Sequence, residues 1–346
     1  MQAIVLVGGE GTRLRPLTSD VPKPALTLVD RPFLAYMIEW LAGHGVTEVV
    51  LACGFLPDVL REALGDGERA GARIRYVAEP EPLGTAGAIR FAADALGDDL
   101  DDRFLALNGD VLTDLDLTAL LEFHKRHQRS AATYPGMPGI SRSGAGDEAA
   151  ATIALHSVED SSAYGLVRTG EGGEVREFLE KTGEEVPGEV NAGMYVLERS
   201  ALDLIPPGEN VSIERDVFPR LVGGGLYGLR LDGYWMDIGT PKRYLQASWD
   251  ILEGRVETRV EPTAPGLLIA PDAEVAADAT VGPRAVVGHG CRVLAGAEIR
   301  DSVLLDGCAI AEGARVAGSI LAPGVEAAPG AVLEGAVVGR DERVSA

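Results

Sequence analysis

The sequence contains few cysteines and no long apolar run. Its three cysteines, Cys53, Cys291 and Cys308, are far apart and odd in number, so they form neither a zinc-binding spacing nor a disulfide framework. A reducing, cytoplasmic location therefore fits the chain best. No eighteen apolar residues run together, and no basic leader precedes the first apolar residues, so we expect neither a transmembrane helix nor a signal peptide.

Basic residues are scarce compared with acidic ones. The chain has 31 Lys and Arg against 53 Asp and Glu, a net charge of −22. This excess of negative charge argues against nucleic acid or an anionic membrane as a partner. An anionic substrate would need a local cluster of cations. The length of 346 residues predicts two domains, and 46% hydrophobic residues are typical of a globular protein.

The glycine-rich stretch "VGGEGTRLRPLTSDVPKPAL" at 7–26 matches neither common phosphate-binding fingerprint. Leu14 stands where G-x-G-x-x-G requires its third glycine, which disfavours an NAD-dependent enzyme, and the Gly-Lys-Ser/Thr of a P-loop is absent. Glycine still lets backbone N–H groups approach phosphate oxygens closely, and Arg13 and Lys23 add positive charge. The stretch is either a polyphosphate cradle or a glycine-rich corner with solvated cations.

Up to about residue 130, strand-like apolar runs alternate with helical patterns. We expect strands at 2–7, 46–54, 73–79 and 103–110, and helices at 31–45, 57–65 and 84–97. This alternation predicts βαβ units on a mostly parallel sheet, with ligands at the carboxyl ends of the strands. Residues 130–240 are richer in strand patterns. The stretch 134–148 is loop-like, and we favour a tolerated surface insertion over a mobile lid.

A six-residue period begins after about residue 262. Apolar residues recur every six positions and, after a slip of one, continue in the same way; they are Val275, Val281, Val287, Val293, Ile299, Leu304, Ile310 and Val316. Such a period is the signature of a parallel β-helix. We therefore expect a catalytic domain at 1–240, a connecting helix and linker at 241–262, and a β-helix domain at 263–346.

Two aspartates follow strand-like runs in different parts of the α/β region. Asp110 lies in "LNGDVL" and Asp237 in "YWMDIGTP". A single such aspartate is usually a turn or cap residue. Two of them can converge on Mg²⁺, which prefers one or two carboxylates together with phosphate oxygens and water.

Six motifs in order resemble the nucleotide-sugar pyrophosphorylases: "GGEGTRLRPLT…PKP", "PLGTAGAI", "LNGD", "EK", "NAGMY" and "WMDIGTP". The resemblance spans residue 1 to about 245. It implies a Rossmann-like domain that joins a sugar 1-phosphate to a nucleoside triphosphate. The C-terminal repeats resemble the left-handed β-helix that a subset of the family carries, including mannose-1-phosphate guanylyltransferases.

The resemblance also implies roles for individual residues. Arg13 and Lys23 would be catalytic, and Asp110 and Asp237 would hold Mg²⁺. The remaining residues fall into two groups. Those implied for nucleotide binding are Gly8, Gly9, Gly11, Thr12, Leu83, Gly84 and Thr85, and those implied for sugar-phosphate binding are Gly165, Glu180, Lys181, Asn191 and Gly193.

The implied chemistry needs no covalent nucleophile or general base. An ionised sugar-phosphate oxygen attacks the α-phosphorus in line and expels pyrophosphate, so catalysis consists mostly of positioning and charge neutralisation. Two positions count against thymidine as the base. Thymidylyltransferases have a glutamine after the early lysine, where this chain has Pro24, and a second glutamine that we align with Gly87. "PLGTAGA" and "ERDVFP" resemble the guanylyltransferase branch and favour GTP and mannose 1-phosphate. Another nucleotide, or glucose, heptose or cyclitol phosphates, remain alternatives.

Two further classes are open at this point. An acyltransferase with His289 as base would suit a β-helix, but about 80 residues give few coils for an acyl-CoA cleft, so we expect His289 to be a plain coil residue. A regulatory homologue that binds nucleotide sugar without turnover is disfavoured, because Arg13, Lys23, Asp110 and Asp237 are all present. We expect the β-helix to form a homo-oligomer surface.

Overall fold

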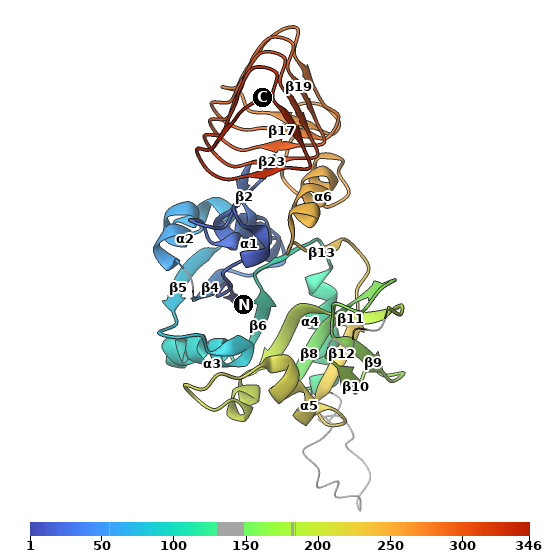
Figure 1. Cartoon of the computed structure of the whole chain (residues 1–346). Coiled ribbons are helices and arrows are strands. Elements are labelled where there is room, and N and C mark those ends of the chain that lie inside the picture. Colours follow the sequence, from blue (N-terminus) through green and yellow to red (C-terminus); the bar gives the residue numbers. More distant parts are fainter. Residues whose placement is uncertain (55, 130–148, 181–182, 184) are drawn as a thin grey trace, which may run out of the picture.

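The computed structural model describes residues 1–54, 56–129, 149–180, 183 and 185–346. Figure 1 shows an α/β domain with a β-helix stacked on one end, and helix α6 (Pro241–Leu252) between them. The stretch 134–148, considered above as an insertion or lid, lies outside the described residues. Within the described part of the chain, no helix is long and apolar enough to cross a membrane.

The N-terminal half builds a parallel sheet from alternating strands and helices, which confirms the expected βαβ pattern. In chain order its main elements are β1 (Gln2–Leu6), α1 (Phe33–Gly43), β4 (Glu48–Cys53), α2 (Pro57–Leu64), β5 (Arg73–Ala78), α3 (Gly84–Leu96) and β6 (Arg103–Asn108). Strand β1 lies between β4 and β6 and is parallel to both. A short antiparallel pair, β2 (Thr27–Leu28) and β3 (Arg31–Pro32), precedes α1.

The sheet separates two apolar cores because side chains alternate along each strand. Ala3 and Val5 of β1 belong to the core that also contains Leu34 of α1. Ile4, between them, belongs to the opposite core with Ile89 of α3. All five of these side chains are fully buried: Ala3, Ile4, Val5, Leu34 and Ile89. The helices on the two faces therefore fix where the strand ends lie.

The second half extends this sheet with antiparallel strands, so the sheet as a whole is mixed. Its elements are α4 (Leu117–Arg129), β8 (Ala151–Val158), β9 (Leu166–Thr169), β10 (Val175–Leu179), β11 (Gly188–Glu198), α5 (Phe218–Leu221) and β12 (Leu226–Arg230). The order is β10-β9-β11-β6-β1-β4-β5, with β8 also paired to β11 and β12 paired to β8. A separate antiparallel pair, β7 (Val111–Thr113) with β13 (Trp235–Asp237), joins the two halves.

The C-terminal strands form the parallel β-helix that the six-residue period predicts. They stack into three sheets, whose strands are β14 (Leu267–Ile269), β17 (Ala285–Val287), β20 (Val303–Leu304), β23 (Ile320–Leu321) and β26 (Val337–Val338); β15 (Glu274–Val275), β18 (Arg292–Val293), β21 (Ala309–Ile310), β24 (Glu326–Ala327) and β27 (Arg343–Val344); and β16 (Thr280–Val281), β19 (Glu298–Arg300), β22 (Arg315–Ala317) and β25 (Val332–Glu334). Leu267 pairs with Ala285, eighteen residues later, whereas Val286 pairs with Val303, seventeen later. This shorter second coil accounts for the slip of one in the period.

An apolar interface joins the β-helix to the α/β domain. Its buried residues come from the loops after β1, from α6 and from one face of the β-helix; they include Leu14, Leu17, Leu26, Tyr244, Ile251, Val286, Leu305 and Ile320. Successive residues of one coil divide between two cores, since Leu304 belongs to the β-helix interior and Leu305 to this interface. The β-helix therefore packs behind the glycine-rich stretch itself, through Leu14, Leu17 and Leu26.

Candidate active site

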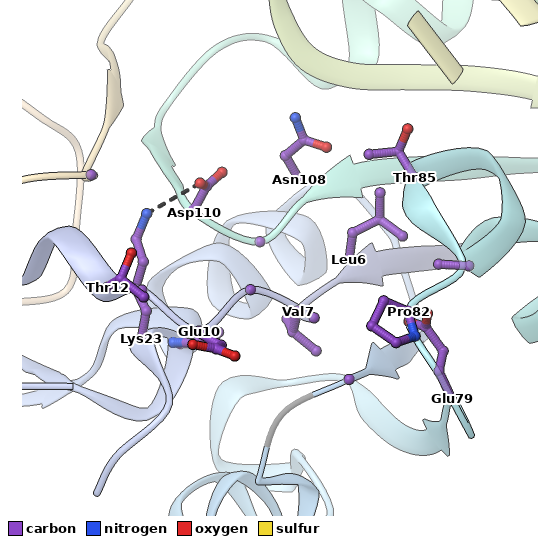
Figure 2. Close-up of a pocket in the computed structure, with 18 of the residues that line it drawn as sticks. Leu6, Val7, Glu10, Thr12, Lys23, Glu79, Pro82, Thr85, Asn108 and Asp110 are labelled. Carbon is purple, nitrogen blue, oxygen red and sulfur yellow. Dashed lines mark hydrogen bonds and ion pairs between the residues drawn. The ribbon is translucent and has the colours of Figure 1, made fainter. Parts of the chain in front are cut away.

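A cavity of about 620 Å³ opens at the carboxyl ends of β1, β4 and β6. This is the edge where ligands are expected on a parallel sheet. Figure 2 shows Lys23, Thr12 and Asp110 at one end of the cavity, and Pro82, Glu79 and Thr85 at the other. The sequence-predicted residues that line it are Gly8, Gly9, Gly11, Thr12, Arg13, Lys23, Leu83, Gly84, Thr85 and Asp110.

The glycine-rich loop forms one wall of the cavity and approaches its neighbours closely. A Cβ on Gly54, after β4, would lie 3.1 Å from the Cα of Gly8. Gly11 has φ +62°, and the Thr18 hydroxyl donates to its carbonyl oxygen at 2.8 Å. The chain then turns through a single 3-10 turn at Thr12–Leu14, which carries Arg13. Glycine is required at Gly11 because the left-handed region is unfavourable for other residues.

Lys23 lies between the two aspartates. Its ammonium nitrogen is 3.1 Å from Asp110 Oδ2 and 3.7 Å from Asp237 Oδ1, and the residue is only 8% exposed. Pairing of β7 with β13 places Asp237 opposite Val111, directly after Asp110. Two carboxylates more than a hundred residues apart in sequence thus share one buried cation.

Asp237 is a largely buried carboxylate close to a second acid, Asp110. Burial, followed by the charge of Asp110, raises the pKa of this carboxyl, while Lys23 opposes the rise. Its Oδ1 is buried and has no hydrogen-bond partner among the described residues. The described part of the chain contains no cluster of three or more Asp, Glu, His or Cys side chains suited to a metal. Two adjacent carboxylates, one with a buried oxygen that accepts no hydrogen bond from the described residues, suit a divalent metal ion, which needs few protein ligands when phosphates supply others.

Two arginines adjoin the same carboxylate. A Cβ on Gly239 would lie 2.7 Å from Arg13 Nη2, so the guanidinium packs against this glycine. Arg243 Nη1 donates to the Asp237 carbonyl oxygen at 3.1 Å and to Oδ2 at 3.5 Å, and its guanidinium lies over the Tyr164 ring. Helix α6 holds Arg243 in place, because the Thr240 hydroxyl caps the helix by accepting from the Arg243 N–H. This cluster supplies the local positive charge that the acidic chain requires for an anionic ligand.

The opposite end of the cavity is lined by Glu79, Pro82, Leu83, Gly84 and Thr85. Leu83 is buried there, and its N–H donates to Glu79 Oε2 at 3.2 Å. Burial raises the pKa of Glu79. Gly87 does not line the cavity; a Cβ there would lie 2.4 Å from the Glu209 carbonyl oxygen. Glu79 is therefore an acidic lining residue at this end of the cavity, whereas position 87 lies outside the lining.

The described residues implied for the sugar phosphate, Gly165, Glu180, Asn191 and Gly193, are not part of the cavity lining. A Cβ on Gly193, at φ +73°, would be 2.8 Å from Asn108 Nδ2, and Asn108 lines the cavity. The Asn191 N–H donates to the Gly165 carbonyl oxygen at 2.9 Å. A Cβ on Gly165 would be 2.9 Å from Glu180 Oε2, which brings these residues together. Lys181 lies outside the described residues.

Sequence reasoning missed several polar residues at this site. Asn108 lies inside the motif "LNGD", which implies a role only for Asp110, and Glu79 precedes "PLGTAGAI" by three residues. Glu214 lies in "ERDVFP", where only the resemblance was noted. His289 is exposed on the β-helix, accepts or donates a hydrogen bond at 2.8 Å with Asp272, and does not line the cavity.

Comparisons with known proteins cover both domains. The family model described as nucleotidyl transferase matches residues 2–144 and 140–254, and the model described as GMPPB C-terminal domain matches 263–346. A mannose-1-phosphate guanylyltransferase from Mycobacterium tuberculosis is 37% identical over 316 residues, covering 88% of this chain and 81% of that protein. A probable mannose-1-phosphate guanylyltransferase 1 from Oryza sativa is 39% identical over 296 residues, covering 85% and 74%.

A solved structure matches most of the chain. The crystal structure of HddC from Yersinia pseudotuberculosis has a TM-score of 0.58 and 26% sequence identity, and the match covers 72% of this chain and 99% of that one. HddC has also been solved in complex with GMP-PN, with the same scores.

Proposed function

Because the chain belongs to the nucleotidyl transferase family, we propose that it joins GTP to mannose 1-phosphate and releases GDP-mannose and pyrophosphate. The chain is a sugar-1-phosphate nucleotidyltransferase related to mannose-1-phosphate guanylyltransferases over most of its length. The single observation that carries the mechanism is Lys23 held between Asp110 and Asp237 at the cavity wall.

The reaction brings two polyanions together, so positioning and charge neutralisation are its main requirements. Backbone N–H groups of Gly8, Gly9 and Gly11, with Thr12, would bind the triphosphate. A mannose-1-phosphate oxygen attacks the α-phosphorus as the bond to the β-phosphate oxygen breaks. Arg13 and Lys23 would stabilise the negative charge that shifts onto the departing pyrophosphate.

Enzymes of this family generally use a divalent metal ion. We propose Mg²⁺, held by Asp110 and Asp237, since the buried Oδ1 of Asp237 has no hydrogen-bond partner among the described residues. When bound, the ion would neutralise phosphate charge. Lys23 would orient both carboxylates, because its ammonium nitrogen lies 3.1 Å from Asp110 Oδ2 and 3.7 Å from Asp237 Oδ1.

Glu79 supports guanine as the base. The Watson–Crick edge of guanine presents an N–H and an amino group, both donors, and a carboxylate offers only acceptors. Glu79 lines the base end of the cavity, where Leu83, Gly84 and Thr85 would pack against the ring. The guanylyltransferase relatives and the GMP-PN complex of HddC agree with this choice.

On the sugar side, we propose that Gly165, Glu180, Asn191 and Gly193, together with Lys181, bind mannose 1-phosphate. Glu180 supplies acceptors for sugar hydroxyl donors, and Lys181 supplies charge for the phosphate. The bulge in β11 between Asn191 and Tyr195 supports this assignment, because it brings Gly193 against Asn108 at the cavity.

Pyrophosphate release tests the proposal directly. Purified protein with Mg²⁺ is assayed with five nucleoside triphosphates against mannose, glucose, heptose and cyclitol 1-phosphates. The highest kcat/KM is expected for GTP with mannose 1-phosphate. Faster release with another pair would reassign the base or the sugar, and no release from folded protein with any pair would refute the enzymatic proposal.

We also propose a cytoplasmic homo-oligomer that associates through the β-helix. All three cysteines are free and buried, which suits a reducing compartment. Two β-helix residues, Leu294 and Val332, are large, apolar and exposed. Light scattering of the wild type and of the Leu294→Lys and Val332→Lys variants tests this idea; a monomeric wild type would contradict it.

A further inference from the structure

A continuous chain of hydrogen bonds joins the base end of the cavity to the sugar-side residues. It starts at Thr85, the second residue of α3, whose hydroxyl donates to Glu214 Oε2 at 2.9 Å and accepts from the Ile213 N–H at 2.7 Å. The Tyr195 hydroxyl donates to the other oxygen, Oε1, at 3.4 Å. Asn191 Nδ2 donates to that hydroxyl at 2.9 Å, and Asn191 Oδ1 accepts from the Gly193 N–H at 2.9 Å.

The backbone around Glu214 is attached to α3 rather than to the sugar side. The Ala86 and Gly87 N–H groups donate to the Val211 carbonyl oxygen, and the Val211 N–H donates to the Leu83 carbonyl oxygen. Glu214 itself lies in one turn of π-helix, Ile213–Val217. Single π-helical turns are rare and frequently occur at functional sites. A carboxylate fixed to the nucleotide side thus reaches a tyrosine on β11.

Tyr195 has no freedom to rearrange without disturbing this chain. It is fully buried, and its ring packs edge-on against Phe218. Burial, and then the charge of Glu214, raise the pKa of Tyr195 well above the ordinary value, so its hydroxyl stays protonated and donates. The position of the Asn191 amide therefore depends on the position of the Glu214 carboxylate.

We propose that Glu214 is a positioning residue that couples the two substrate pockets, so that nucleotide bound against Thr85 fixes Asn191 for the sugar phosphate. This inference rests on the proposed function, since it assigns Thr85 to the nucleotide and Asn191 to mannose 1-phosphate. Coupling between sites is reciprocal, so each substrate must tighten the binding of the other by the same factor.

The chain offers a matched pair of variants to test this coupling. Tyr195→Phe removes the hydroxyl that links Glu214 to Asn191 and keeps the ring on Phe218. Ser212→Ala removes another hydroxyl from the same carboxylate, since Ser212 Oγ donates to Glu214 Oε2 at 2.8 Å. It also removes the cap that Ser212 Oγ provides for the Arg215 N–H, but it keeps every group that links Glu214 to Asn191. A merely structural role of Glu214 would make the two variants alike.

Calorimetry with Mg²⁺ measures the affinity for mannose 1-phosphate with and without guanosine 5′-(α,β-methylene)triphosphate, which cannot be cleaved at the α-phosphorus. We expect the nucleotide to tighten wild-type binding of mannose 1-phosphate about tenfold. Ser212→Ala should keep this factor, and Tyr195→Phe should reduce it to about two or less. If Tyr195→Phe does not fold, Glu214→Gln replaces it and should show the same loss.

Three results would overturn the coupling. The first is an equal tightening factor in Tyr195→Phe and Ser212→Ala. The second is independent binding of the two ligands to the wild type, and the third is a tightening factor that persists in Glu214→Gln. A wild type that binds neither ligand refutes the proposed function as well, so the two failures are distinguishable.

Discussion

The packing of the β-helix behind the glycine-rich loop leads to a quantitative prediction for two neighbouring leucines. Leu305 is 3% exposed and lies in the interface core with Leu14, beside a small cavity that it lines with Leu17 and Leu26. Leu304 is fully buried in the β-helix interior. Replacing either by alanine removes the same atoms from a core, at a cost of about 3 kcal/mol each.

The consequence for activity should differ between the two. Leu305→Ala removes packing from behind the loop that carries Arg13, whereas Leu304→Ala removes it from a core that the loop does not contact. If about half of the lost packing energy in Leu305→Ala is felt by the loop, kcat/KM for GTP falls about tenfold, because 1.4 kcal/mol corresponds to a factor of ten. For Leu304→Ala we expect kcat/KM within about twofold of the wild type.

Two measurements decide the matter. Denaturant unfolding followed by tryptophan fluorescence gives the loss of stability, and Trp249 on α6 reports on the interface because Arg284 of the β-helix lies over its ring at 4.5 Å. Pyrophosphate release at varied GTP gives kcat/KM. Equal activity of the two variants, at similar losses of stability, would refute the idea that the β-helix supports the loop.

Three other predictions concern single side chains. Asp110→Asn should lower Mg²⁺-dependent kcat by more than about a hundredfold with an unchanged circular dichroism spectrum, and wild-type turnover by the folded variant would rule out the metal assignment. Glu79→Gln should erase the preference for GTP over ITP, about tenfold or more in kcat/KM, because ITP lacks the amino donor; an unchanged ratio would show that Glu79 does not read the base. Burial holds the pKa of His124 below its ordinary value, so the unfolded chain takes up a proton first as the pH falls through about 6.5. The free energy of unfolding should therefore decline from pH 7 to 5, by at most about 1.4 kcal/mol per pH unit for this group. Denaturant titrations of His124→Gln should show a shallower decline with pH. A decline in the variant as steep as in the wild type would contradict the assignment.

The fold was largely predictable because it depends on local periodicity. Alternation in β1, helical spacing in α1 and the six-residue repeat of the β-helix are all visible within short windows of the sequence. Helix α4 was missed, since its apolar positions are interrupted by charged residues and lie next to a stretch with loop composition. The antiparallel strands β9, β10 and β11 were expected only as a β-rich region, because strand pairing is a long-range property.

The residue types of the site were predictable, but their contacts were not. The motifs named Lys23, Asp110 and Asp237, yet nothing local indicates that the lysine is buried between the two carboxylates. The pairing of β7 with β13 decides that contact. Glu79 and Glu214 resemble ordinary surface acids in the sequence, and only the close packing of Gly84 and Gly87 against 209–211 brings the segment of Glu214 to α3.

The sequence by itself determined the two architectures, the excess of negative charge and the set of motifs, because each depends on composition or on spacing within a few turns or strands. Only the tertiary structure decided which charges meet, which acid lines the cavity near Leu83, and that Leu305 packs in the interface core while Leu304 packs in the β-helix interior. These outcomes follow from strand register and from contacts between segments that lie far apart in the chain, where a shift of one residue reverses which side of the sheet or coil a side chain occupies.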